Sequence, residues 1–346
     1  MKYYVGLDVH KTFTTVGVFD PASGELAVLG QAHTQSGELE ELIGRVPDPK
    51  IVVLEAGRSS HWLAARLEPV AEEVWMVDPG KVRQLSQAGK KTDKRDARAI
   101  AFFAGKGLLE PICRPEAELL NLRELTRLQA AVTRQATQIR NSIRSLLARH
   151  GYECSACDLL SAKAKAYLDQ VEGKLPGYVR VGLQTWRALL PVLAEQAAKL
   201  TALVQQEAKK YRPAQRLDSV PGIGAVISLG LAVEIGDPHR FPTAIRLRGY
   251  SGLVPAVSQS GARDSRGKLT KSGNKWLRYY AVLGAQKAIQ TTKADGRLKR
   301  TYWSVAGRHG RNPAKVAVAR QLLDLAHHLL LHDEDYQARE FSKKKA

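Results

Sequence analysis

The stretch that decides the fold of this chain is residues 3–20, YYVGLDVHKTFTTVGVFD. Two runs rich in β-branched and aromatic residues flank a polar segment at 10–12, and the second run alternates through Thr15, Val16, Val18 and Phe19. Such runs around a polar turn predict two adjacent strands. Asp8 therefore lies within the first strand of the protein.

Further strands and helices alternate after this pair. The apolar run IVVLEA at 51–56 predicts a short strand, and EVWMVDP at 73–79 predicts another that stops at Pro79 and Gly80. Residues 61–73 between them have helical spacing, with one apolar face. That face comprises Trp62, Leu63, Leu67 and Val70. Over about the first 110 residues the order indicates an α/β layer.

Two long helices are predicted next, over 119–149 and 183–210, and both repeat apolar residues at 3–4 spacing. Pro191 is expected to kink the second helix or to start its main part. With a loop over 150–182 between them, the helices predict an antiparallel arm, plausibly a coiled coil; an ordinary helical bundle is the alternative. Cys113, Cys154 and Cys157 are too few for a disulfide framework and are interpreted as structural thiols.

The C-terminal third is predicted to be mostly helical. A linker at 211–217 precedes Pro221-Gly222-Ile223-Gly224 and an apolar helix, an arrangement that resembles a helix-hairpin-helix element and leaves backbone N–H groups open to a phosphate. Helices follow at 243–250, 274–292 and 313–332, separated by a loop at 251–273 and a basic connector. Asn312 and Pro313 are predicted as cap and first-turn proline of the last helix.

Charge points to a polyanion as partner. The chain has 346 residues, 44% of them hydrophobic, and a net charge of +19. Residues 240–320 hold 18 Lys and Arg against only Asp264 and Asp295. Because basic side chains displace counterions from phosphates, nucleic acid is the first choice and an anionic membrane surface the second. No apolar run approaches the roughly 20 residues of a membrane span, and no signal pattern precedes the first strand, so a cytoplasmic protein is expected.

Four acidic residues have the order expected of a metal site. Asp8 lies on the first strand, Glu55 closes an apolar strand, and Asp93 and Asp96 lie three apart in KKTDKRDARAIA. Each alone has an ordinary explanation, as a cap or a solvated face, but a carboxylate that ends a buried strand costs desolvation unless it has a partner. Together they predict a divalent-metal site that acts on phosphodiesters. Asp78 is a fifth candidate for which a turn role suits better.

The loop GYSGLVPAVSQSGARDSRGKLTKSGNKWLRYY at 249–280 is rich in glycine, serine and basic residues. Its hydroxyls predict contact with phosphate; attack by a serine needs a base, a metal or flanking cations. Residues expected to hold a nucleic-acid backbone are distributed along the whole chain. They are Lys90, Lys91, Lys94, Arg95, Gly222, Gly224, Arg246, Arg248, Arg263, Lys271, Lys275 and Arg278.

With these residues placed, the chain resembles a transposase of the DEDD insertion-sequence family, which includes the pilin-inverting recombinase and the bridge-RNA-guided recombinases. The resemblance covers nearly the whole chain but is poor in the central helices and absent at about 150–180. It is carried by GLDVHKT, by VVLEAG with KTDKRDARAIA, and by SVPGIG through RLRGYSGLVP, SG and LTKSGNKWLR.

The resemblance implies an α/β plus α architecture with four segments. These are an RNase-H/RuvC-like domain at 1–115, a helical coiled-coil arm at 116–212, a mostly helical serine transposase domain at 213–335, and a basic tail at 336–346. It also implies that Asp8, Glu55, Asp93 and Asp96 hold Mg²⁺, or Mn²⁺ in its place. The family's nucleophilic serine falls on Ser260, with Ser258 as the alternative.

The implied reaction cuts donor and target DNA through a phosphoserine intermediate and rejoins the strands. The implied assembly is a homo-tetramer, a dimer of dimers, guided by a bridge noncoding RNA in the cytoplasm of a bacterium, at the nucleoid when active. Two other functions remain open. One is a RuvC-like endonuclease or junction resolvase in which metal-activated water attacks, and the other is a non-catalytic nucleic-acid-binding protein.

Overall fold

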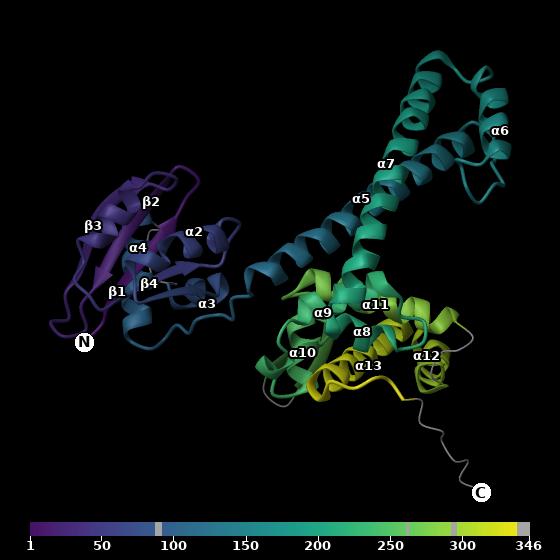
Figure 1. Cartoon of the computed structure of the whole chain (residues 1–346). Coiled ribbons are helices and arrows are strands. Elements are labelled where there is room, and N and C mark those ends of the chain that lie inside the picture. Colours follow the sequence, from purple (N-terminus) through teal and green to yellow (C-terminus); the bar gives the residue numbers. More distant parts are fainter. Residues whose placement is uncertain (87–91, 261–262, 292–295, 338–346) are drawn as a thin grey trace, which may run out of the picture. The chain divides into compact units, whose positions relative to one another are not determined.

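The computed structural model describes residues 1–346 except 87–91, 261–262, 292–295 and 338–346; for 257–260 and 263–268 it describes the backbone alone. The chain divides into two compact units, Met1–Arg114 and Pro115–Ala346 (Figure 1). Within the part of the chain that the structure describes, no helix has both the length and the apolarity needed to cross a membrane.

The first unit is built on a five-stranded sheet in the order β3-β2-β1-β4-β5. Its strands are β1 (Tyr3–Val9), β2 (Phe13–Phe19), β3 (Leu26–His33), β4 (Lys50–Glu55) and β5 (Glu73–Val77). The pairs β1–β2 and β2–β3 are antiparallel, while β4 runs parallel to β1 and β5 parallel to β4. The four predicted strands are confirmed, and β3 is an addition that the sequence analysis did not predict.

Helices cover both faces of this sheet. The apolar side chains of α1 (Glu38–Gly44) and α2 (Ser60–Leu67) pack on the face that carries Leu7 and Leu54, whereas α3 (Pro79–Leu85) and α4 (Asp93–Gly105) pack on the face that carries Ile51 and Val53. The prediction for Trp62 is wrong: its side chain is 49% exposed and stacks under the Arg66 guanidinium instead of entering the core. A short 3-10 turn, Glu68–Val70, follows α2. Asp78 caps α3, which confirms its turn role.

Two glycines let α4 lie directly on the sheet. A Cβ at Gly6 would come within 2.3 Å of the Ala97 carbonyl oxygen, and one at Gly17 within 2.7 Å of the Arg98 nitrogen. Contacts that short do not occur with a real Cβ, so the main chains of helix and strands approach as closely as glycine permits. The approach fixes the position of α4 over β1.

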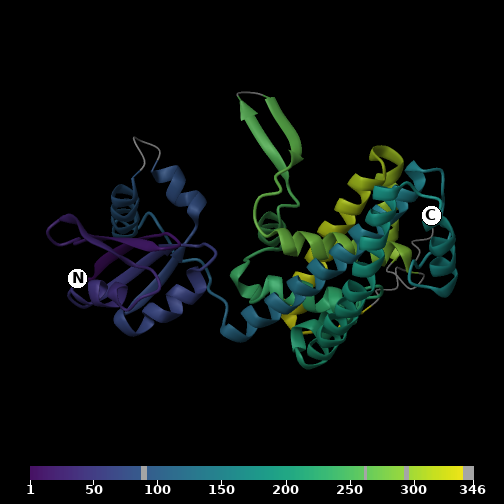
Figure 2. The same cartoon turned by 90° about the horizontal axis from the view of Figure 1, so that it is seen from above.

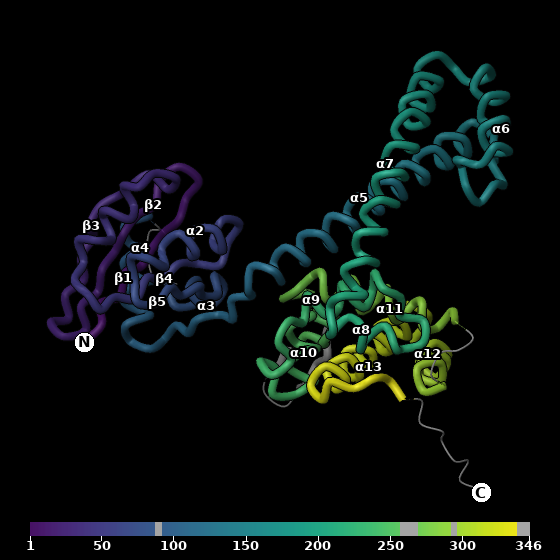
Figure 3. The backbone as a smooth tube through the Cα atoms, viewed as in Figure 1, coloured from purple at the N-terminus to yellow at the C-terminus, as the bar shows by residue number. Residues whose placement is uncertain are grey.

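The second unit begins with an arm of helices. The predicted long helices are α5 (Ala117–Arg149) and α7 (Gly177–Lys210), which runs without a break through Pro191. They pack against each other in opposite directions, since Gln129 meets Thr201 near one end while Gly182 lies against Leu146 near the other. The predicted loop at 150–182 is wrong in part, because α6 (Ala162–Glu172) lies within it at the far end of the arm (Figure 3).

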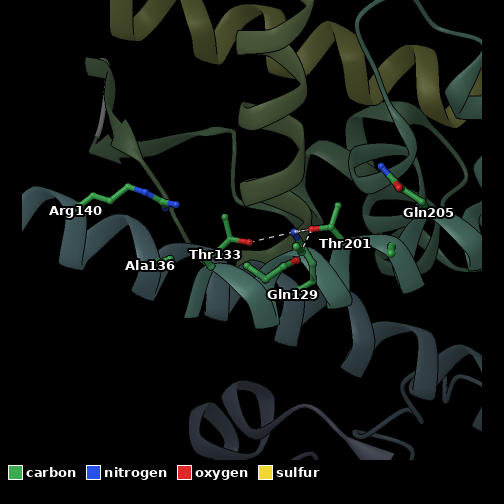
Figure 4. Close-up of a pocket in the computed structure, with 10 residues that line it drawn as sticks. Gln129, Thr133, Ala136, Arg140, Thr201 and Gln205 are labelled. Carbon is green, nitrogen blue, oxygen red and sulfur yellow. Dashed lines mark hydrogen bonds between the residues drawn. The ribbon is translucent and has the colours of Figure 1, made fainter. Parts of the chain in front are cut away.

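Small side chains line the contact between the two arm helices. A pocket of about 390 Å³ lies there. Figure 4 shows residues that line it, and Gln129 donates from its amide to the hydroxyls of Thr133 and Thr201 at 3.1 and 3.0 Å. Alanines on α7 form much of the wall, namely Ala194, Ala197, Ala198 and Ala202. The arm is therefore held by polar bridges and alanine packing at this level rather than by large apolar residues.

The rest of the unit is a helical bundle around α9 (Ala225–Ile235), in which residues 227–235 are all buried. Around it pack α8 (Arg212–Asp218), α10 (Ala244–Ser251), α11 (Lys275–Gln290), α12 (Gly296–His309) and α13 (Arg311–His332), with a 3-10 turn at Pro238–Arg240. Tyr280 of α11 is buried and donates to the carbonyl oxygen of Thr126 at 2.7 Å, which ties the bundle to the arm.

Four local predictions for this region are corrected. The linker at 211–217 is helix α8, and the basic connector contains α12. The loop at 251–273 contains a hairpin of β6 (Pro255–Ser260) and β7 (Arg263–Leu269), seen projecting from the bundle in Figure 2. The cap of α13 is Gly310, not Asn312, while Pro313 does lie in the first turn as predicted.

Candidate metal centre and serine hairpin

Asp8 and Glu55 lie at neighbouring strand ends on the same face of the sheet. The parallel pairing of β1 and β4 ends with Leu7 opposite Leu54, and each acid is the next residue along its strand. Since side chains alternate along a strand, both carboxylates point away from the Leu7 face, toward the face that α4 covers. Register alone thus brings two acids 47 residues apart in sequence to one edge of the sheet.

The start of α4 supplies the other two acids. Asp93 is the first residue of the helix and Asp96 lies in the same turn, with Thr92 as the N-cap. Because Gly6 lies under Ala97 and Ala101, this first turn lies over the end of β1, where Asp8 is. The sequence analysis placed these acids on a helix, and the structure shows how that helix is aligned with the strand.

His10 completes the cluster. Its Nε2 lies 3.2 Å from Asp8 Oδ2 and 3.6 Å from Asp93 Oδ1. Ligand atoms of Asp8, His10 and Asp93 all lie within 4.8 Å of one another, which is the one such group among the residues that the structure describes. The sequence analysis placed His10 in the polar segment after the first strand and gave it no chemical role; it lies one residue beyond the end of β1.

The Asp8 carboxyl is electrostatically perturbed. Burial raises its pKa above the usual range, His10 opposes that shift, and the negative charges of Asp96 and Asp93 raise it further. Only 19% of the Asp8 side chain is exposed, against 54% for Asp93. A half-closed cluster of like charges around a buried acid is an arrangement that a bound cation would stabilise.

The cluster fits a small divalent cation. An octahedral ion with ligands about 2.1 Å away separates neighbouring ligand atoms by about 3 Å and opposite ones by about 4.2 Å. The ligand atoms of the three side chains lie within 4.8 Å of one another, which is close to that spacing, and Asp93 is 54% exposed. Oxygen donors favour Mg²⁺ or Mn²⁺, and an imidazole nitrogen in the set favours the transition metal.

Basic residues flank the cluster in the first turn of α4. Lys94 and Arg95 are exposed beside Asp93. Lys90 and Lys91, which were also predicted to hold a nucleic-acid backbone, lie outside the residues that the structure describes. Of the four cations predicted beside the acids, the structure therefore describes Lys94 and Arg95.

Ser260 lies at the end of a hairpin far along the chain. It pairs with Arg263 across the strands and is the last paired residue before the turn, while Ser258 pairs with Ser265 one step closer to the bundle. Both serines and Arg263 are thus carried on a two-stranded ribbon. The ribbon brings the serine segment away from the helices that support it (Figure 2).

The base of the hairpin is clamped by glycines and an asparagine. A Cβ at Gly252 would come within 2.1 Å of the Ser272 carbonyl oxygen, and one at Gly273 within 2.3 Å of the Tyr250 carbonyl oxygen. The Asn274 nitrogen donates to that Tyr250 oxygen at 2.7 Å, and its side chain caps α11. The two ends of the hairpin therefore cross in main-chain contact.

A buried ionic network supports the same base. Glu234 of α9 is fully buried and accepts from both Nε and Nη2 of Arg127 at 2.7 and 2.9 Å. The Asn274 amide donates to the same carboxylate at 2.8 Å and lies 3.2 Å from the Tyr250 hydroxyl. Arm, bundle and hairpin base thus share one set of hydrogen bonds.

Two cations predicted to hold DNA are engaged internally. The Arg248 guanidinium pairs with Asp324 of α13, and Arg278 donates to the Ser251 carbonyl oxygen at 2.7 Å. Both bonds hold α10 and the hairpin base against the bundle. Arg246, Lys271 and Lys275 are exposed around the same base.

The glycines of the PGIG turn have different surroundings. Gly222 has φ +89° and a Cβ there would come within 2.9 Å of the Ala288 Cα, so packing against α11 already requires glycine. Gly224 caps α9, and a Cβ there would meet open space. Of the two glycines in the predicted phosphate-binding turn, Gly224 is therefore the one with open space beside it.

Comparison with known proteins identifies the family. Residues 5–151 match a transposase family of the DEDD type named for IS110, and residues 214–302 match the transposase family IS116/IS110/IS902. The chain belongs to the IS110/IS116/IS902 transposases. As a transposase it is an enzyme of DNA cleavage and strand transfer, and the first match contains all four acids that were predicted to hold a metal.

Similar proteins extend over almost the whole transposase. A probable family 20 transposase of Pseudomonas aeruginosa is 25% identical over 96% of this chain and 98% of its own length. The transposase for insertion sequence element IS1111A of Coxiella burnetii is 26% identical over 88% of this chain and 85% of its own. The transposase for insertion sequence element IS1328 of Yersinia enterocolitica is 24% identical over 84% of this chain and 86% of its own length.

Proposed function

We propose that this transposase cleaves insertion-sequence DNA at the centre formed by Asp8, Glu55, Asp93 and Asp96, with His10 as a further ligand. The observation that carries the proposal is the convergence of Asp8, His10 and Asp93 within 4.8 Å. The sheet order, with β1–β3 antiparallel and β4 and β5 parallel beside them, supports an RNase-H/RuvC-like domain. The carboxylate oxygens of the donor set support Mg²⁺ or Mn²⁺, and His10 as a further ligand would favour Mn²⁺.

The residues of the centre have separable roles. A bound cation supplies Lewis-acid stabilisation of charge on the scissile phosphate. Asp8 and Glu55 are held by the sheet and give the fixed side of the centre, while Asp93 and His10 are more exposed and face the substrate. Lys94 and Arg95 neutralise the neighbouring DNA phosphates.

The attacking group in this proposal is water. Its oxygen attacks phosphorus, its proton passes to a carboxylate of the centre, and the leaving oxygen departs with the other strand end. This form of the reaction needs only residues of the first unit. The nuclease alternative of the sequence analysis is thus the one that the geometry of the described side chains supports better.

A serine nucleophile is the second candidate. Its support is the place of Ser260 at the end of a projecting hairpin, next to the turn and opposite Arg263. In that form the Ser260 hydroxyl oxygen attacks phosphorus and loses its proton, the P–O3′ bond breaks, and the 3′-oxygen leaves as a hydroxyl while the 5′ end stays esterified to the serine. The 3′-hydroxyl of the partner strand later attacks this ester, rejoins the DNA and releases the serine hydroxyl. The same metal centre serves both forms.

One set of variants distinguishes attack by water from attack by Ser260. Purified protein is mixed with labelled element-end DNA and Mg²⁺ or Mn²⁺, and both cleavage and detergent-resistant protein–DNA adducts are measured. Asp8→Asn should abolish cleavage in either form, whereas Asp20→Asn, which changes a half-buried acid just past β2 at the opposite end of the strands, should not. If Ser260→Ala leaves cleavage intact and no adduct forms, water attacks. An adduct lost in Ser260→Ala but kept in Ser258→Ala supports the serine form.

The wider assembly is also a proposal. The surplus of Lys and Arg over 240–320 supports binding of donor and target DNA, and a bridge noncoding RNA would bind by the same charge. Sequencing of RNA that copurifies with the protein tests the guide. The mass of the protein–DNA complex in solution tests the homo-tetramer, because a dimer or monomer competent in strand transfer would contradict it.

A further inference from the structure

One face of helix α12 packs against the bundle, and the other exposes a tryptophan among basic residues. Leu298 and Tyr302 are buried against the bundle, with Val305 and Ala306 partly buried beside them. Trp303, on the other side, is 68% exposed. An indole has a larger apolar area than most side chains, so an exposed indole on a well-packed helix marks a surface that a partner could contact.

Positive charge surrounds this indole. Residues 296–323, which contain α12 and the first half of α13 beside it (Figure 1), hold seven Lys and Arg and no acid. Lys299 and Arg300 precede Trp303 by one helical turn, which puts them on its side of the helix. Arg308 and Arg311 are exposed at the junction of α12 and α13. The partner that this field attracts is a polyanion.

One edge of the indole is left open. The residue one turn after Trp303 is Gly307, and a Cβ there would meet nothing within 4 Å. Tyr302 contacts the indole ring in a T-shaped arrangement at 5.1 Å and supports it from the buried side. The ring thus has cations on its N-terminal side, a support beneath, and free space on its C-terminal side.

We propose that Trp303 stacks on an unpaired base of a single-stranded nucleic acid whose phosphates bind the cations of α12 and the start of α13. Aromatic rings set among Lys and Arg hold single strands because every base has a π-face, whereas a fully paired duplex offers none along its length. Charge complementarity selects nucleic acid over an apolar protein partner. The proposal rests on the nucleic-acid partner of the proposed function, but not on its metal centre.

The test is binding without cleavage. Full-length protein in EDTA is titrated into labelled single-stranded DNA, single-stranded RNA and duplex DNA of equal length, and fluorescence anisotropy is followed at several salt concentrations. Trp303→Ala should weaken single-strand binding about 5- to 150-fold, the range found for loss of one stacked base. Trp303→Phe should keep most of the affinity. Comparison of the DNA and RNA arms identifies which strand the surface prefers.

A matched control uses another exposed aromatic residue. Tyr178 at the start of α7 is 96% exposed, and Tyr178→Ala should leave single-strand binding unchanged. Wild-type affinity in Trp303→Ala would overturn the proposal, as would an equal loss for duplex and single strand. A lower oligomeric mass of Trp303→Ala with unchanged binding would assign the surface to a second copy instead. Because metal is absent, loss of cleavage in Asp8→Asn affects none of these outcomes.

Discussion

The metal centre and the serine hairpin hold their functional residues in opposite ways. Asp8, Glu55 and Asp93 are placed by strand register and by a helix in main-chain contact with the sheet. Ser260 is placed by a two-stranded ribbon that is clamped at its base. A two-stranded ribbon is only marginally stable by itself, whereas a covered sheet is rigid. The first region is therefore held on both sides by a packed core, whereas the second is held at its base alone.

The largest effect is expected where the rigid region is chemically disabled. Asp8→Asn removes a proposed metal ligand but keeps the shape of the side chain, so DNA cleavage should fall about 1000-fold while DNA binding in EDTA is unchanged. Isothermal titration with Mn²⁺ should show the lost site directly. Full cleavage by this variant would separate the centre from the reaction.

The next effect tests the support of the hairpin. Arg127→Ala leaves the buried Glu234 carboxylate without its main partner, so the free energy of unfolding of the second unit should fall by about 3 kcal/mol. Urea unfolding measures this change. Lys199→Ala, which breaks an exposed pair with Glu195 on α7, is the control and should change stability by less than about 0.5 kcal/mol.

A smaller effect is expected where the helix meets the sheet. Gly6→Ala introduces a Cβ 2.3 Å from the Ala97 carbonyl oxygen, so α4 must shift and stability should fall by about 1–3 kcal/mol. The shift also displaces Asp93, and Mn²⁺ affinity should fall about 10-fold although no ligand is changed. Gly107→Ala, which meets nothing within 4 Å but has φ +70°, would lose stability through strain without loss of metal affinity.

The smallest effect is a pH dependence of the metal-free protein. The pKa of Asp8 is raised in the folded state, so the native protein holds this proton more tightly than the unfolded chain does. Its contribution to stability is present below the ordinary carboxyl pKa of 3.8 and is lost as pH rises through the raised value. Thermal unfolding in EDTA should show this loss for wild type and not for Asp8→Asn. Mn²⁺ should reverse it at neutral pH.

The contrast between the regions also governs what sequence could predict. Strand alternation and apolar runs fix which face Asp8 and Glu55 occupy, so the α/β layer and the acids followed from pattern. The ribbon did not, because SQSGARDSRG is polar on both faces and rich in turn residues, and its pairing comes from backbone bonds. Helix α12 was missed since its many cations obscured the apolar face formed by Leu298, Tyr302 and Val305.

Partner choice of individual side chains was the least predictable feature. Nothing in the sequence distinguishes Arg248, which pairs with Asp324, from Arg246, which is exposed two residues earlier. The difference depends on which side of α10 faces α13, and tertiary packing determines that. His10 was not predicted because a histidine in the turn after a strand carries no signal in the sequence that it will contact Asp8.

The arm sets a length scale for the molecule. Beyond Arg127, where it is bonded to the bundle, α5 continues to Arg149, a rise of about 33 Å at 1.5 Å per residue. That span is close to one turn of B-form DNA, about ten base pairs. A partner bound at the distal helix α6 would therefore lie about one duplex turn from the bundle. The length of the arm would set that distance.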